Sequence, residues 1–172
     1  LPWVIWATAA LGLNLLMGFA GQIHLGYAAV MAIGAYTAIH AVRAGVPFEL
    51  GLIAGGLVSS VIGLVFGAAA LRVKGLYLAV TTLAMQSIVD WIIVHVPVIS
   101  GGSQATLQAP AIRVLGQPVL SDEGRYWIAL VVCVLVTSFL LNTRRTSFGR
   151  ALVAVREKDF AAAIIGISPF RY

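Results

Sequence analysis

Five long apolar runs, separated by stretches that carry glycine, proline or arginine, occupy most of this 172-residue chain. They cover approximately residues 2–19, 26–42, 50–71, 76–96 and 126–141. A helix of about 20 apolar residues is long enough to cross the hydrocarbon core of a bilayer. Only 10% of the residues are charged, whereas soluble domains have roughly 25%. The sequence therefore predicts an all-α, polytopic transmembrane bundle of about five membrane segments.

The chain begins inside the first apolar run, without an initiator Met or a signal peptide. We therefore expect residues 1–172 to be an internal fragment of a larger transmembrane domain. The stretch 97–124 is rich in Gly and Pro and is expected to be a periplasmic loop, with a small hairpin over residues 112–120.

The basic residues are distributed unevenly between the two sides of such a bundle. The formal net charge is +5, and six of the eleven basic residues lie in the stretch 143–172. If that stretch is cytoplasmic, alternation of the segments also places Arg72 and Lys74 inside, and places Arg43, Arg113 and Arg125 outside. Because cytoplasmic loops carry an excess of Lys and Arg, this orientation is the favoured one. The positive charge then indicates a membrane, and no nucleic-acid partner is expected.

The stretch 143–172 also carries helix signals. Ser147 is a candidate N-cap, a helix-forming run starts at Arg150, and Gly166 is a candidate stop. Ser168 and Pro169 then indicate a new helix start. The sequence predicts a short helix in water, next to the membrane.

The first two apolar runs are joined by a broken or tightly turned region near residues 18–27, G-F-A-G-Q-I-H-L-G-Y. It has three glycines and almost no charge. Non-helical backbone at membrane depth is tolerated only where it is buried in protein or lines water. Gln22 and His24 are therefore candidates for a translocation pathway, although a lone histidine is more often structural.

Polar side chains inside the apolar runs are further pathway candidates. Asn14 needs a partner on another helix or a wet cavity. Thr82, Gln86 and Asp90 follow one another at steps of four, so they share one side of a helix. A carboxylate costs about 2.5–3.5 kcal/mol at the centre of a membrane helix. Asp90 is thus either a cavity-lining residue or an interfacial anchor, and we select Asn14, Gln86 and Asp90 as candidates.

Small residues recur every four positions in the third run, at Gly51, Gly55, Ser59, Gly63 and Gly67. In lipid, such rows let helix backbones approach closely. We expect the row to pack against another helix. Leucine should be tolerated poorly at Ser59 and worse at Gly55 or Gly63.

Three separated blocks, in the right order, resemble permeases of the branched-chain amino acid ABC transporter family. They are L-G-L-N-L-L-M-G-F-A-G-Q-I-H-L-G-Y-A-A-V-M-A-I-G-A-Y-T-A from residue 11, L-R-V-K-G-L-Y-L-A-V-T-T-L-A from residue 71, and S-F-G-R-A-L-V-A-V-R-E-K-D-F-A-A from residue 147. Four positions depart from the family pattern. His24 replaces a serine, Val30 replaces an aromatic residue, and Ser87 and Asp90 stand about where family members often carry Glu and Arg. In the general importer signature, Phe160 takes the place of a Glu.

The resemblance implies a function and partners. The stretch 143–172 would contain a coupling helix, around residues 150–165, that docks on a separate ATPase subunit. Apolar side chains would fill a groove on the ATPase, polar ones would form its rim, and glycines would shape the loop. The residues concerned are Gly149, Arg150, Leu152, Val155, Arg156, Glu157, Asp159, Phe160 and Gly166.

The family further implies alternating access in a bacterial cytoplasmic membrane. The expected partners are ABC ATPase subunits, a homologous second permease subunit, a solute-binding protein and membrane lipid. ATP would be bound by the partner subunits, so this chain needs no cofactor. The solute would be a branched-chain or related amino acid, with urea and amides as alternatives.

A secondary transporter with broken helices is the rival interpretation from another class. The chain has no P-loop, no Ser/His/Asp set and no His-Glu-x-x-His run. Its three histidines lie far apart, and Cys133 is its one cysteine. The sequence therefore predicts neither an enzyme nor a metal site.

Overall fold

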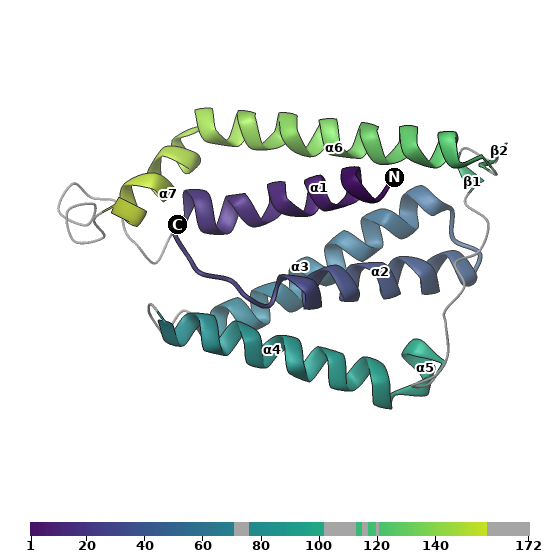
Figure 1. Cartoon of the computed structure of the whole chain (residues 1–172), viewed down its shortest axis with the longest axis horizontal. Coiled ribbons are helices and arrows are strands. Elements are labelled where there is room, and N and C mark those ends of the chain that lie inside the picture. Colours follow the sequence, from purple (N-terminus) through teal and green to yellow (C-terminus); the bar gives the residue numbers. More distant parts are fainter. Residues whose placement is uncertain (71–75, 102–112, 115–116, 120, 158–172) are drawn as a thin grey trace. The chain divides into compact units, whose positions relative to one another are not determined.

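The computed structural model describes residues 1–70, 76–101, 113–114, 117–119 and 121–157. Within these ranges the chain is almost entirely helical (Figure 1). The elements, in chain order, are α1 (Pro2–Asn14), the π-helical turn η1 (Leu15–Phe19), α2 (Tyr27–Arg43), α3 (Phe48–Ala70), α4 (Leu76–His95), α5 (Pro97–Ser100), β1 (Arg113–Val114), β2 (Gln117–Pro118), α6 (Asp122–Arg145) and α7 (Ser147–Glu157). The predicted all-α polytopic fold is confirmed.

In the described part of the chain, four helical stretches are long and apolar enough to cross a membrane: Pro2–Phe19, Phe48–Ala68, Tyr77–His95 and Asp122–Arg145. The remaining long helix, α2, has 17 residues. At about 1.5 Å per residue it is roughly 26 Å long, slightly shorter than a hydrocarbon core of about 30 Å. The second apolar run is therefore helical as expected, but it falls just below the length of a full span.

Helix α6 is longer at both ends than the apolar run 126–141 that predicted it. Its first turn holds Asp122 and Glu123, and its last turn holds Arg144 and Arg145. Acidic groups at a helix N-terminus and basic groups at its C-terminus interact favourably with the helix dipole. The apolar run thus marks only the part suited to lipid, whereas the charged ends continue the helix.

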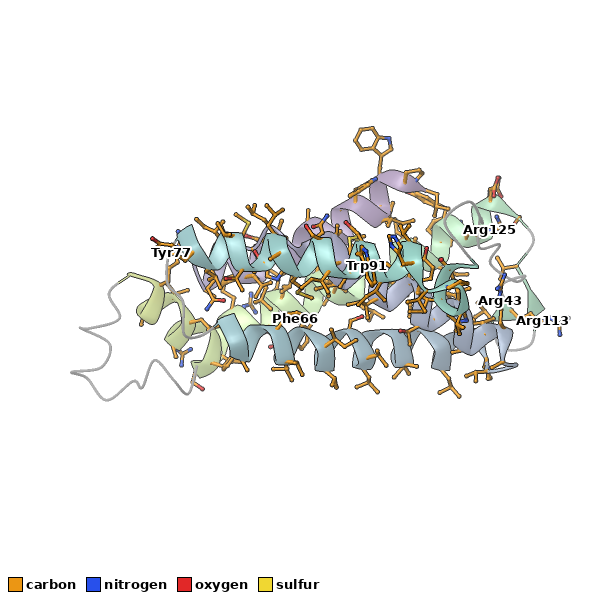
Figure 2. The ribbon with its side chains drawn as sticks, turned by 90° about the horizontal axis from the view of Figure 1, so that it is seen from below. Arg43, Phe66, Tyr77, Trp91, Arg113 and Arg125 are labelled. Carbon is orange, nitrogen blue, oxygen red and sulfur yellow. The ribbon has the colours of Figure 1, made fainter. Side chains whose placement is uncertain are left out.

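The chain forms two compact units, and their boundary falls between Ile23 and His24 and again after residue 121. The unit of residues 24–121 contains α2, α3 and α4. Its core holds Ala29 of α2 with Met85 and Val89 of α4, and Ile62 and Phe66 of α3 pack against them. Phe66 is labelled on α3 in Figure 2. Three helices thus share one apolar centre, which holds the start of α2 against α4.

The small-residue row of α3 packs against α2 over only part of its length. A Cβ built on Gly55 lies 2.6 Å from the Gly34 carbonyl oxygen, and one built on Gly51 lies 3.0 Å from Val42 Cγ2. Ser59 is buried and donates a hydrogen bond of 2.6 Å to the Gly55 carbonyl. These three positions therefore form the close contact that the spacing predicted.

Gly63 and Gly67 differ from that expectation. Within the described residues, a Cβ built on either glycine meets nothing within 4 Å. Helices α2 and α3 cross (Figure 1), and crossing helices stay in close contact for only a few turns. Gly63 and Gly67 therefore lack the close contact that the spacing predicted within the described residues, and the effect of leucine at Gly63 stays a prediction.

The same unit carries the predicted hairpin. Strands β1 and β2 pair antiparallel, with Arg113 opposite Pro118 and Val114 opposite Gln117. Arg113 and Arg43 lie at one end of the unit, and Tyr77, near the start of α4, lies at the other end (Figure 2). Two of the three basic residues that the charge pattern assigned to the outer side of the membrane thus lie at the same end of this unit.

The other described unit consists of residues 1–23 and 122–157. In it α1 runs alongside α6, and α7 turns away after the end of α6 (Figure 1). Thr146 forms this corner: its hydroxyl donates to the Thr143 carbonyl at 2.6 Å and accepts from the Gly149 amide at 3.3 Å. The N-cap is therefore Thr146 and not Ser147, because Ser147 is already the first helical residue.

The predicted short helix after the last apolar run is confirmed over Ser147–Glu157. Gly149 lies close to the corner, where a Cβ would overlap the Thr143 carbonyl and lie 2.9 Å from Arg144 Cα. A glycine at this position lets α7 leave α6 sharply. The predicted stop at Gly166 and the new start at Ser168 and Pro169 lie outside the described residues.

Candidate translocation and coupling site

The centre of the candidate site is the break between α1 and α2. The last turn of the first helix widens into η1, where the Ala20 amide donates to the Leu15 carbonyl at 3.3 Å and the Gln22 amide donates to the Leu16 carbonyl at 3.1 Å. Residues 21–26 then have no regular structure. Single π turns inside α-helices are frequent at functional sites. The glycine-rich stretch that the sequence singled out is thus a real interruption of the helix.

The first half of the break lies in the unit of residues 1–23 and 122–157. There it is contacted by the side chain of Arg156, a residue of α7. Its guanidinium donates a hydrogen bond to the Gly18 carbonyl oxygen. Its aliphatic stem lies against Gly21, where a built Cβ would be 2.6 Å from Arg156 Cγ and 3.1 Å from Cδ. Gly21 has a φ of 67°, a conformation that side-chain-bearing residues seldom adopt. Glycine is therefore required at this turn both for its backbone and for the space that Arg156 fills.

The second half of the break, in the unit of residues 24–121, is fastened to α4 by Thr82. The Thr82 hydroxyl accepts a hydrogen bond of 3.0 Å from the Leu25 amide and donates one of 2.9 Å to the Ala79 carbonyl. Thr82 is 6% exposed, and a Cβ on Gly26 would overlap its carbonyl oxygen. Amide groups at a helix start lack intrahelical acceptors. Thr82 therefore supplies the acceptor that the non-helical backbone before α2 needs.

Thr82 and the Arg156 contact were not among the residues selected as carrying these roles. The signal for Thr82 was present, because it begins the row of polar residues spaced by four that includes Gln86 and Asp90. No comparable signal identified Gly18 as the partner of Arg156, since the two residues are 138 positions apart. The family resemblance had assigned Arg156 to a rim contact with an ATPase.

The predicted pathway residues lie in different surroundings. Asn14 is exposed, and its side-chain oxygen lies over Gly18, where a Cβ would overlap it. Gln22 is exposed in the break. His24 is half-buried, and its Nδ1 is enclosed without a hydrogen-bond partner among the described residues. The imidazole lies edge-on to the Tyr27 ring at a centroid distance of 6.5 Å.

The other two pathway candidates lie on α4. Gln86 is half-buried and Asp90 is exposed, about one and two turns beyond Thr82. His24, Gln86 and Asp90 belong to one unit, whereas Asn14 and Gln22 belong to the other. The row on α4 thus becomes steadily more exposed from Thr82 to Asp90.

Several of the predicted coupling residues can be located on α7. Gly149 is buried and Leu152 is half-buried. The exposed side chain of Arg150 donates to the Arg145 carbonyl at 2.7 Å, so it satisfies the end of α6. The side chains of Val155 and Glu157 lie outside the described part, as do Asp159, Phe160 and Gly166.

Apolar helices long enough to span a bilayer, a glycine-rich break and a short helix turned off the last span define a multi-pass helical membrane protein. The chain belongs to the family described as the branched-chain amino acid transport system permease component, which it matches over residues 3–172. This match confirms the resemblance drawn from the three sequence blocks.

Two curated relatives are described as the high-affinity branched-chain amino acid transport system permease protein LivM. The chain is 32% identical to that of Salmonella typhimurium (strain LT2) and 31% identical to that of Escherichia coli (strain K12). Each alignment covers 98% of this chain and 45% of the relative. The chain therefore spans less than half of the length of these relatives. No solved structure is significantly similar to it.

Proposed function

We propose that this chain is part of the permease of an ATP-binding-cassette importer that moves branched-chain or related amino acids across the bacterial cytoplasmic membrane. Transport proceeds by alternating access, and separate ATPase subunits bind and hydrolyse ATP. A homologous second permease subunit completes the pathway, and a solute-binding protein delivers the amino acid. The family match and the names of the curated relatives support this assignment.

The observation that carries the coupling role is the geometry of α7. This helix starts at a sharp corner after α6, which Gly149 and Thr146 make possible. One of its arginines, Arg156, reaches the end of the first membrane helix at Gly18. A short helix with such contacts is suited to receive force from another subunit and pass it to the membrane helices.

The orientation follows from charge. Arg144 and Arg145 end α6 next to α7, and an excess of basic residues favours the cytoplasmic side. The opposite side then receives Arg43 and Arg113, which lie at one end of their unit (Figure 2). We therefore infer that the α7 end of α6 faces the cytosol and that the hairpin lies outside, in reach of a binding protein.

Cysteine labelling tests this orientation. Ser147→Cys and Arg113→Cys are introduced separately into a Cys133→Ala background, and intact cells are treated with a membrane-impermeant maleimide. We expect label at position 113 only, because α7 is cytoplasmic. Labelling at 147 and not at 113 contradicts the orientation.

Reconstitution tests the transport function. The permease is co-expressed with its ATPase and second permease subunits, and leucine uptake into proteoliposomes is measured with binding protein and ATP. We expect ATP-dependent uptake, and we expect Gly149→Pro and Glu157→Lys to lower uptake strongly while leaving insertion intact. Normal uptake in both variants removes α7 from the mechanism.

The same preparation separates the alternatives. Co-purification of an ATPase subunit supports the importer, whereas uptake driven by an ion gradient without ATP supports a secondary transporter. Competition of leucine uptake by urea or acetamide reveals an amide-type permease.

A further inference from the structure

The carbonyl oxygen of Gly18 is at the C-terminal end of a helix, where the last carbonyl groups have no intrahelical donor. Such an end carries partial negative charge, so a cation is favoured there. Arg156 supplies both the donor and the cation from α7. The end of the first membrane helix is therefore completed by a side chain that belongs to another element, 138 positions later in the chain.

The position of the Arg156 side chain is restricted along its length as well as at its tip. Its Cγ, Cδ and Nε lie 2.6, 3.1 and 3.4 Å from the position of a Cβ on Gly21. The left-handed backbone at Gly21 turns this surface toward the arginine stem. Because the stem and the guanidinium each contact the break, α7 cannot shift without moving this turn or releasing it.

The turn itself is wider than an α-helical turn. Its hydrogen bonds span five residues at Ala20 and six at Gln22, in place of the four of an α-helix. A change in the position of the Gly18 carbonyl can therefore alter the pairing of these amides. Neither bond involves Arg156, so their strength reports on the turn independently of the arginine.

We propose that Arg156 is a positioning residue that sets the conformation of residues 15–22 according to the position of α7. This inference rests on the proposed function, because it takes α7 as the helix that an ATPase subunit moves. Arg156 then works inside the permease, as the link from α7 to the break, and not as a rim contact on the ATPase. Removing its donor leaves α7 able to bind the ATPase but unable to control the turn.

Amide hydrogen exchange in the assembled transporter, in nanodiscs, tests this assignment. Arg156→Met keeps the length of the stem without a donor, and Arg156→Lys keeps one charged donor. Arg150→Met is the matched control, because it removes the same charge from the same helix. The Arg150 side chain donates to the Arg145 carbonyl and not to the break. Exchange of the peptide over residues 15–22 is measured without nucleotide and with a non-hydrolysable ATP analogue, and ATPase co-purification is recorded for each variant.

We expect exchange at Ala20 and Gln22 to rise about tenfold in Arg156→Met, because a charge-assisted hydrogen bond that holds the turn is lost. The nucleotide-dependent change in this peptide should disappear in the same variant, while the ATPase still co-purifies. Arg156→Lys should restore most of the response, and Arg150→Met should leave exchange in residues 15–22 at the wild-type level.

Three results decide against the inference. A preserved nucleotide response in Arg156→Met with the ATPase bound overturns it. Loss of ATPase co-purification with unchanged exchange over residues 15–22 assigns Arg156 to the ATPase contact instead. An equal rise in exchange in Arg150→Met shows only a general loosening of α7. If the wild-type permease binds no ATPase, the proposed function fails, and the comparison of Arg156→Met with Arg150→Met still tests the link.

Discussion

Adding one methyl group at Gly55 should weaken the α2–α3 contact, whereas the same change at Gly63 should not. The Cβ of an alanine at Gly55 would lie 2.6 Å from the Gly34 carbonyl oxygen and 3.4 Å from Ala38 Cβ. The first distance is about 0.8 Å short of the 3.4 Å where ordinary contact begins. The oxygen belongs to the backbone of α2 and cannot rotate away, so the helices must separate. A Cβ at Gly63 meets no described atom within 4 Å.

The size of the effect follows from comparing the two variants. Both glycines lie in α3, so the preference of the helix for Ala over Gly, about 1 kcal/mol in each case, cancels in the difference. What remains is the cost of overpacking, typically about 1–3 kcal/mol. Gly55→Ala should therefore be less stable than Gly63→Ala by that amount, or roughly 5- to 150-fold in the unfolding equilibrium. Gly55→Leu should be worse, with Ser59→Leu also destabilising.

Unfolding in mixed micelles, followed by circular dichroism against the mole fraction of sodium dodecyl sulfate, measures this difference. Wild type, Gly55→Ala and Gly63→Ala are compared at the same protein concentration. Equal midpoints for the two alanine variants would refute the reasoning, because they would show that the α2–α3 contact does not depend on backbone approach at Gly55.

Three further outcomes are expected. Thr82→Val should speed amide exchange at Leu25 by about tenfold or more, because an unsatisfied buried donor costs about 1–3 kcal/mol; Thr82→Ser keeps the acceptor and should exchange as wild type does. Gly149→Ala should lower ATP-dependent leucine uptake several-fold without loss of membrane insertion, because its Cβ overlaps backbone at the α6–α7 corner; wild-type uptake would contradict this. His40→Phe should increase proteolysis near α5, because the imidazole contacts the Ile99 carbonyl at 2.8 Å; an unchanged cleavage pattern would show that this bond does not hold α5.

Much of the fold could be predicted because its signals are local. Apolar runs long enough to cross a bilayer indicate membrane helices. In lipid, backbone N–H and C=O groups without hydrogen bonds are costly, so few structures other than helices are possible. The turn-rich stretch before α6 indicated the hairpin, and the run from Arg150 indicated α7. Helix ends were predicted less well: charged residues extend α6 at both ends, and Thr146 caps α7 in place of Ser147.

The candidate site was predicted only in outline. The glycines and polar residues near residues 18–27 correctly marked a break in the helix. However, glycine is required at these positions for different structural reasons. Gly21 makes room for Arg156, whereas Gly26 makes room for the backbone of α4 at Thr82. Neither neighbour is adjacent in sequence.

The amino-acid order alone was sufficient for the membrane class, the family and the location of the break, because hydrophobicity and glycine content act on each segment separately. Folding in three dimensions was needed to distinguish Gly55 from Gly63 and to join Leu25 to Thr82 and Gly18 to Arg156, across 57 and 138 positions. Hydrogen bonds and close backbone contacts depend on which helix surfaces pack together. Helical periodicity shows which residues share one side of a helix, but it does not show which other helix packs against that side.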